Sequence, residues 1–145
     1  MSKKAEYALR AVIAMGRRGV TKPVQIQDLS RSERIPVKFL EHILLALKKA
    51  NLLRSKRGAG GGYQLNKKAE DISLGEVLEA IDGPFLPSSC LEVGQPGRCG
   101  CGQFKPCGMG TLLGELQHQV TSFLYSKSIA DAIAREHQAT PNFDI

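Results

Sequence analysis

The stretch Leu52-Leu53-Arg54-Ser55-Lys56-Arg57-Gly58-Ala59-Gly60-Gly61-Gly62-Tyr63-Gln64-Leu65 decides the fold of this chain. Its two ends have the composition of short strands, and its centre combines glycines with basic side chains. Such a hairpin can bring its backbone close to a phosphate, and a basic side chain at its tip suits the negative potential of a narrow DNA groove. A hairpin of this kind, placed after a pair of helices, is typical of a winged helix.

A glycine-rich loop can also cradle the phosphates of a nucleotide. Gly58 and Gly60 fit the first two positions of a G-x-G-x-x-G motif, but Tyr63 occupies the third, and no G-K-[ST] follows. The spacing therefore disfavours a nucleotide site. A plain flexible hairpin without a function stays open as an alternative.

Three helices are predicted before the hairpin, over residues 4–17, 24–31 and about 36–50. The third begins at Pro36, a residue suited to the first position of a helix. The last two are joined by a tight break, which predicts a helix-turn-helix. The third helix has two faces. Its apolar face consists of Leu40, Ile43, Leu44 and Leu47, and its other face carries Lys38, Glu41, His42 and Leu45.

The charge of the chain is divided unevenly. Residues 1–70 contain 16 Lys/Arg and 5 Asp/Glu, whereas residues 71–145 contain 4 and 9, and the whole chain has a net charge of +6. A basic first half suggests a module that binds a polyanion, joined to a sensor or assembly module. A solvated surface with uneven charge is the alternative. No run is long and apolar enough for a membrane span or a signal peptide, so we expect a cytoplasmic protein.

The second half begins with a predicted helix over residues 71–84, capped by Ser73 or Asp71. Apolar residues then recur at helical spacing from Met109 to about Glu136, as one long helix or two. Such a helix has little surface of its own chain to pack against, so a second copy is expected to cover it. The last residues, 139–145, are expected to fray.

All four cysteines lie between these parts, in a loop rich in glycine and proline. Their clustering in a reducing compartment favours metal ligation or redox chemistry over disulfides. Structural zinc sites usually have two C-x₂₋₄-C pairs, which this loop lacks, whereas iron–sulfur clusters tolerate more varied spacing. A cluster, zinc and metal-free thiols all remain open on spacing alone. The four thiols are Cys90, Cys99, Cys101 and Cys107.

The chain resembles the Rrf2 family of bacterial transcription regulators over nearly its whole length. The hairpin and the segment after it are the most specific parts of this resemblance. It rests on the cysteines and on Lys4-Ala5-Glu6-Tyr7-Ala8-Leu9-Arg10-Ala11, Phe39-Leu40-Glu41, Arg57-Gly58-Ala59-Gly60-Gly61-Gly62-Tyr63 and Ile72-Ser73-Leu74-Gly75-Glu76-Val77.

The resemblance implies a homodimer that reads palindromic double-stranded promoter DNA and carries a [2Fe-2S] or [4Fe-4S] cluster, held by three cysteines and one other ligand. Cys101 and Cys107 match the last two family thiols, and either Cys90 or Cys99 supplies the first. The histidine that some members place three residues after the last cysteine is Gly110 here. Other members use an acidic residue of the first helix, which aligns with Glu6.

Two alternatives for the ligand set stay open. The first is ligation by all four cysteines. The second is that Glu6 has no ligand role, because a carboxylate in the first turn of a helix is favoured by the helix dipole.

The expected DNA contacts come from the third helix and the hairpin. We expect Lys38, Glu41, His42, Arg57, Gly60 and Gly61 to reach the DNA, and Lys3, Lys4, Arg54 and Lys56 to contact phosphates.

The sequence thus predicts an α+β, mainly helical fold: a winged helix-turn-helix over residues 1–84, a cysteine-rich cluster loop over 85–109, a dimerisation helix over 110–138 and a tail over 139–145. The predicted function is a DNA-binding transcription regulator, not an enzyme, whose promoter binding depends on a cluster that senses redox, iron or nitric oxide status. A metal-free regulator that senses thiol oxidation or a small metabolite is the main alternative. An iron–sulfur electron-transfer protein is a weaker one, because it leaves the basic half unexplained.

Overall fold

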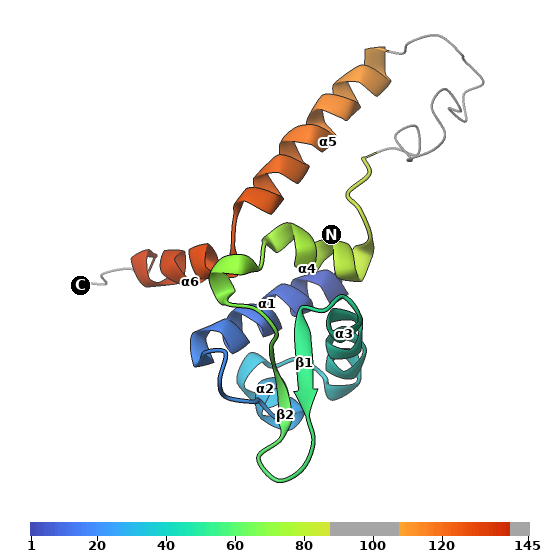
Figure 1. The fold of residues 1–145 in the computed structure, drawn as a ribbon. Coiled ribbons are helices and arrows are strands. Elements are labelled where there is room, and N and C mark those ends of the chain that lie inside the picture. Colours follow the sequence, from blue (N-terminus) through green and yellow to red (C-terminus); the bar gives the residue numbers. More distant parts are fainter. Residues whose placement is uncertain (88–107, 140–145) are drawn as a thin grey trace, which may run out of the picture.

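The computed structural model describes residues 1–87 and 108–139. A body of helices and a two-stranded sheet is formed by the first part together with the last helix, and one helix extends away from this body on the side opposite the hairpin (Figure 1). The elements are α1 (Lys3–Arg18), α2 (Ile26–Glu33), α3 (Val37–Lys49), β1 (Leu53–Lys56), β2 (Gly62–Leu65), η1 (Ala69–Asp71), α4 (Leu74–Asp82), α5 (Gly108–Ser126) and α6 (Ile129–Gln138).

Helix α1 begins at a serine cap. The Ser2 hydroxyl accepts a hydrogen bond from the backbone N–H of Ala5 at 3.0 Å, which satisfies one of the free donors of the first turn. The same serine donates through its backbone N–H to Asp82 at the end of α4, at 2.9 Å. The start of α1 is thereby joined to the end of α4, 80 residues along the chain.

The helix-turn-helix consists of α2 and α3. Between them Arg34 adopts a left-handed conformation (φ 55°, ψ 47°), and the next residue, Ile35, is buried and donates to the Ser30 carbonyl at 3.1 Å. Pro36, predicted as the first helical residue, is instead the N-cap: its ψ of 135° is extended, and the helix begins at Val37. The fixed φ of proline fits both positions, so the sequence does not separate them.

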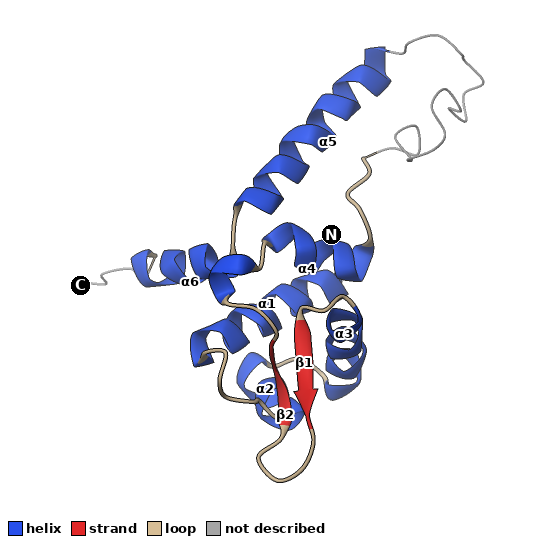
Figure 2. Ribbon diagram, viewed as in Figure 1, coloured by secondary structure: helices blue, strands red, loops and turns tan. Residues whose placement is uncertain are grey.

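The hairpin of β1 and β2 is the only sheet in the described part of the chain (Figure 2). Its antiparallel register pairs Leu53 with Leu65 and Lys56 with Gly62. A further bridge joins Tyr63 to Val24, through hydrogen bonds of 2.7 and 2.9 Å in the two directions. The bridge holds the start of β2, next to the hairpin tip, against the segment before α2.

Helix α4 starts at a full capping box, in which Ser73 and Glu76 exchange hydrogen bonds with each other's backbone N–H. This confirms Ser73 as the cap. A second capping box, between Ser128 and Asp131, starts α6. The two capping serines lie side by side in an antiparallel bridge, so the first turns of α4 and α6 meet.

The segment from Met109 to about Glu136, predicted as one long helix or two and assigned to dimerisation over residues 110–138, forms two helices. It divides at Lys127 and Ser128, where the second capping box begins a new helix. Helix α6 then packs on α1 and η1, and Ile129 is fully buried. Helix α5 packs on α4, but none of its residues is buried. Within the described residues, no helix is long and apolar enough to span a membrane.

The core lies where α1, α3 and the hairpin meet. The predicted apolar face of α3 is confirmed as buried. The largest fully buried side chains are Met15, Leu29, Ile35, Leu40, Ile43, Leu44, Leu47, Leu52, Leu53, Leu65, Ile72 and Ile129.

Candidate nucleic-acid interface

The outward face of α3 is polar and solvent-exposed. Lys38, Glu41 and His42 are all exposed and point away from the buried face of the helix. The structure therefore leaves these three side chains available to a groove of DNA, as the helical spacing predicts. No hydrogen bond or ion pair within the described residues occupies them.

One side of α3 is fixed to the hairpin. The Lys48 ammonium group donates to the Ser55 hydroxyl of β1 at 2.8 Å. Because this bond joins the end of α3 to the first strand, it helps to set the angle between the helix and the hairpin. Sequence reasoning missed this pair, since neither residue type signals a long-range partner.

The other side of α3 contacts α1 through an aromatic pair. The rings of Phe39 and Tyr7 lie edge to face with their centroids 6.0 Å apart. Lys3 and Arg10 lie over the Tyr7 ring, at 5.1 and 5.7 Å from its centroid. Phe39 nevertheless stays 48% exposed. The start of α3 is therefore in direct contact with the first turns of α1.

The tip of the hairpin combines exposed basic groups with a tight glycine turn. Arg57, Lys56 and Gly60 are exposed, whereas Gly61 is buried and donates its N–H to the Gly58 carbonyl at 2.9 Å. The structure thus places Gly61 inside the turn, where it shapes the tip on which Arg57 lies. Gly60 remains accessible at the surface.

The remaining predicted phosphate contacts are also at the surface. Arg54 is exposed on β1, opposite Gln64 of β2 in the strand pair. Lys3 and Lys4 are exposed at the start of α1. All three residues belong to the basic first half of the sequence, residues 1–70.

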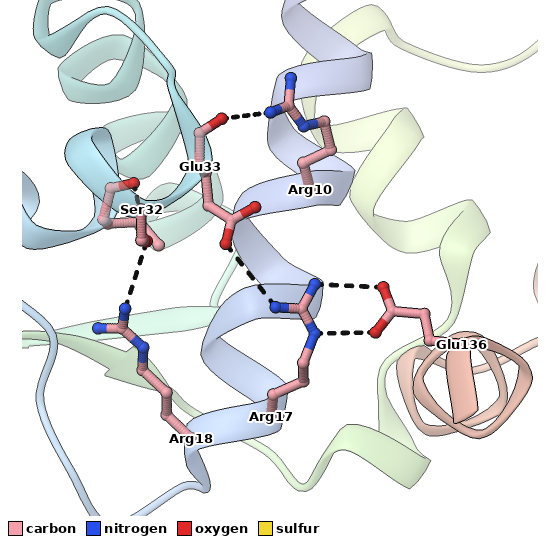
Figure 3. A network of polar contacts seen from close by, with 7 residues as sticks. Arg10, Arg17, Arg18, Ser32, Glu33 and Glu136 are labelled. Carbon is pink, nitrogen blue, oxygen red and sulfur yellow. Dashed lines mark hydrogen bonds and ion pairs between the residues drawn. The ribbon is translucent and has the colours of Figure 1, made fainter. Parts of the chain in front are cut away.

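A network of arginines on α1 connects three helices (Figure 3). Arg17 forms two contacts with Glu136 of α6, the shorter at 2.8 Å, and an ion pair with Glu33 of α2 at 3.7 Å. The hydrogen bond with Glu136 is the main reason why the pKa of Arg17 is raised above its ordinary value, against a smaller opposing effect of burial. Arg10 donates to the carbonyl of Glu33. The network holds α2 in place against α1 and α6.

All four cysteines lie outside the described residues. Among the described residues, no three His, Cys, Asp or Glu side chains gather as a metal site. Glu6, the fifth candidate ligand, is described: its side chain is 46% exposed and pairs with Lys3 at 3.2 Å. A surface ion pair of this kind is weak, about 0–1 kcal/mol, so Glu6 is free to exchange its partner.

A groove of about 530 Å³ lies between α4 and α5. Leu78, Val120 and Leu124 give it apolar walls, and Gln117 donates to the carbonyl of Phe85 at its rim, at 3.1 Å. The adjacent surface of α5 is strongly exposed and apolar. Its exposed residues are Met109 (57%), Leu112 (67%), Leu116 (45%) and Phe123 (52%), which we call the α5 stripe.

Three comparisons with known proteins agree with this architecture. IscR of Klebsiella pneumoniae strain 342, an HTH-type transcriptional regulator, is 31% identical over 147 residues, covering 95% of this chain and 87% of the relative. A putative rrf2-like regulator of Rhodobacter capsulatus is 39% identical over 95 residues, which is 63% of each protein.

Solved structures show the same fold. IscR of T. potens matches with a TM-score of 0.78 at 21% identity, covering 97% of this chain and 90% of that one. CymR, the global cysteine regulator of B. subtilis, matches with a TM-score of 0.75 at 24% identity, covering 93% of this chain and 96% of that one. Both likenesses support a winged-helix fold.

The chain also matches a protein family over most of its length. The model of the Rrf2 family, described as iron-dependent transcriptional regulators, matches residues 1–135. Together with the exposed face of α3, the glycine turn of the hairpin and the relatives named above, this match shows that the chain belongs to the Rrf2 family of transcriptional regulators.

Proposed function

We propose that this regulator acts in the cytoplasm as a homodimer, binds a palindromic promoter site, and has its DNA affinity controlled by an iron–sulfur cluster. The observation that carries the DNA-binding part is the joint exposure of the outward face of α3 and of Arg57 at the hairpin tip. A helix of this kind fits the major groove, and an arginine at the tip of a wing fits the narrow minor groove.

The proposed DNA contacts follow from side-chain chemistry. Glu41 can accept a hydrogen bond from the amino group of cytosine, while Lys38 and His42 can donate to acceptors on base edges or phosphates. Lys3, Lys4, Arg54 and Lys56 supply charge for phosphates, which fixes register without reading sequence. Gly60 lets the backbone of the tip approach the DNA, and Gly61 shapes the turn.

The dimer is proposed from the α5 stripe. Its residues recur on one side of α5, and the described part of the chain leaves that side uncovered. An exposed apolar surface of this length is a candidate for protein contact. Palindromic DNA has the same two-fold symmetry as a dimer. A dimer formed through the α5 stripe would therefore present one DNA-binding face to each half-site.

The cluster is proposed from the donor set. Cys90, Cys99, Cys101 and Cys107 supply thiolates, the ligands that iron–sulfur clusters use, and Glu6 supplies an exchangeable carboxylate. When bound, the cluster would supply an iron- and redox-dependent link between the cysteine segment and the rest of its ligand set.

Glu6 is also adjacent in sequence to a residue that contacts α3, the proposed recognition helix. The next residue, Tyr7, contacts Phe39 at the start of α3. A change in the partner of Glu6 therefore acts on the turn of α1 against which the recognition helix rests. This proximity supports Glu6 as the residue that couples the ligand set to DNA affinity.

A metal-free regulator is the second candidate. It is favoured by the likeness to CymR, the global cysteine regulator of B. subtilis, whose Staphylococcus aureus counterpart has also been solved in an oxidised form. In that case the four thiols would sense oxidants or a metabolite directly.

The DNA-binding part is tested by titration of a duplex at several salt concentrations. Affinity should fall steeply with salt, because each neutralised phosphate releases counterions. Arg57→Ala should weaken binding, whereas Arg135→Ala, which removes an exposed arginine of α6, should not. Equal affinity for wild type and Arg57→Ala would remove the wing from the proposal.

The cluster is tested by anaerobic purification with iron and sulfide quantification and absorption spectroscopy. Cys101→Ala and Cys107→Ala should abolish the cluster, and one of Cys90→Ala and Cys99→Ala should be nearly silent if three thiols bind. Glu6→Ala should preserve folding but change the spectrum or stability of the cluster. Colourless, iron-free protein would favour the metal-free regulator. A wild-type spectrum for Glu6→Ala, with loss in all four cysteine variants, would indicate four-thiolate ligation.

A further inference from the structure

Leu45 lies in the middle of the outward face of α3. At about 100° per residue it is within roughly 20° of Lys38 around the helix axis, between Glu41 and His42. Its side chain is 47% exposed, although its neighbours on this face are polar or charged. An apolar side chain is therefore presented to solvent from the centre of the proposed DNA-reading surface.

An isolated exposed leucine is ordinary on a protein surface, so its position must carry the argument. The other large apolar side chain of α3 that is about half exposed, Phe39, is explained by its contact with Tyr7. Leu45 has no comparable aromatic contact within the described residues. It also completes the spacing i, i+3, i+4, i+7 with Lys38, Glu41 and His42. A helix lying in the major groove presents side chains to the bases with this spacing.

The chemistry of the major groove then limits what Leu45 can recognise. Leucine has no hydrogen-bonding group, and the apolar feature that base edges offer there is the C5 methyl group of thymine. We propose that Leu45 determines sequence specificity by packing against a thymine methyl group in each half-site of the target DNA. This inference rests on the proposed DNA contact of α3 and adds a specific base to it.

The surroundings of Leu45 favour DNA over a protein partner as its occupant. Lys38 precedes it by two turns on the same face, and Lys49 follows it by one turn. Residues 1–70, which contain α3, hold 16 Lys/Arg against 5 Asp/Glu. In DNA, a thymine methyl group in the major groove is flanked by the phosphates of the backbone. Basic side chains around one apolar side chain are complementary to that arrangement.

The test removes the methyl group without changing any hydrogen-bonding group. A target site is first selected from random duplexes with full-length protein purified anaerobically. Each thymine of that site is then replaced in turn by deoxyuridine, symmetrically in both half-sites, and affinities are measured by fluorescence anisotropy. Wild type should lose about fourfold in affinity per half-site at one thymine position, the amount expected for one buried carbon.

Three variants make the test specific to Leu45. Leu45→Ala should bind thymine and deoxyuridine at that position equally, and it should fold, because alanine favours helices and the site is exposed. Leu45→Met, which keeps an apolar side chain, should retain a preference for thymine. Lys38→Ala should bind more weakly but keep the methyl dependence of wild type.

The outcomes separate this inference from the function on which it rests. Tight, selective binding without any methyl dependence would overturn the role of Leu45, and so would a methyl dependence that survives in Leu45→Ala. Leu45→Ala that binds the site normally but loses a protein partner would assign the side chain to protein docking instead. Failure to select any duplex would overturn the DNA contact of α3, and this inference with it.

Discussion

Individual residues at the hairpin differ in why they are needed. Gly58 and Gly62 both have positive φ angles, 97° and 145°. A Cβ on Gly58 would meet nothing within 4 Å, whereas a Cβ on Gly62 would lie 2.4 Å from the Val24 carbonyl oxygen. Position 58 therefore needs glycine only for its positive φ angle. Position 62 needs glycine for its φ angle and also because a side chain there would clash with Val24.

Gly62→Ala should therefore destabilise the protein more than Gly58→Ala. The φ angle should cost about 1 kcal/mol in both variants. Only Gly62→Ala should add about 1–3 kcal/mol for the clash that disturbs the bridge between Val24 and Tyr63. Urea unfolding at neutral pH measures the difference. Equal losses in the two variants would mean that the bridge adapts without cost.

A second residue-scale prediction concerns acid. Burial raises the pKa of Glu76, but hydrogen bonds from Ser73 and from Lys67 outweigh it and hold this pKa below its ordinary value of 4.5. A lowered carboxyl pKa contributes stability above that ordinary value and loses it as the pH falls through the folded value. Glu76→Gln should cost about 1 kcal/mol at pH 7, and the gap to wild type should narrow below about pH 4. A gap that stays constant in urea unfolding from pH 7 to pH 3 would contradict this.

At the scale of elements, α4 and α5 meet closely because one residue is glycine. A Cβ on Gly75 would lie 2.4 Å from the Tyr125 ring. The Tyr125 hydroxyl donates to Glu79, one turn further along α4. The C-terminal end of α5 is thus attached to α4 through the ring of Tyr125, which lies directly on the backbone of α4 at Gly75.

Gly75→Ala should push this ring, and α5 with it, away from α4. We expect a loss of about 1–3 kcal/mol in unfolding free energy. Combining it with Tyr125→Ala should cost less than the sum of the two single variants, since the clash disappears with the ring. Thermal denaturation of the four proteins completes the cycle. Strict additivity would show that Tyr125 is not what Gly75 accommodates.

The sequence predicted the elements better than their ends and contacts. The apolar face of α3 and the hairpin could be predicted because their spacing repeats within a few residues. The boundary between α5 and α6 was not predicted, because the apolar residues from Met109 to about Glu136 left one long helix or two open. The local signal for the boundary was the S/T-x-x-D/E pattern of Ser128 and Asp131.

The candidate site was predictable to the same degree. Periodicity told which side of α3 is exposed and so identified Lys38, Glu41 and His42. It could not tell what each covered face packs against, so the contacts of Tyr7 with Phe39 and of Arg17 with Glu136 were missed. Such pairs join residues tens of positions apart, and a single sequence contains no local signal for them.

At the scale of the whole molecule, the body and α5 differ in how well their apolar side chains are covered. The body encloses its own core, whereas α5, which carries the exposed α5 stripe, extends from the body on the side away from the hairpin (Figure 1). A second copy that covers this stripe would leave both DNA-binding faces free.

Replacing Leu116 and Phe123 by glutamate should therefore give monomers, because charges do not tolerate an apolar contact. Sedimentation at micromolar concentration should show wild-type dimers and monomeric variant. Leu116→Glu alone should weaken the dimer as well, and Leu45→Glu is its matched control, since it places one glutamate at a comparably exposed leucine of the body and should stay dimeric. A monomeric wild type would refute the dimer.

The uncovered α5 also has a consequence for how the backbone exchanges with solvent. Local opening costs little where a helix has no buried side chain, so the amide hydrogens of an unassociated α5 should exchange with deuterium quickly. Those of α1, which lies in the core, should exchange slowly at any dilution. Dilution should thus accelerate deuterium uptake in residues 108–126 alone, which makes this helix a built-in reporter of the association constant.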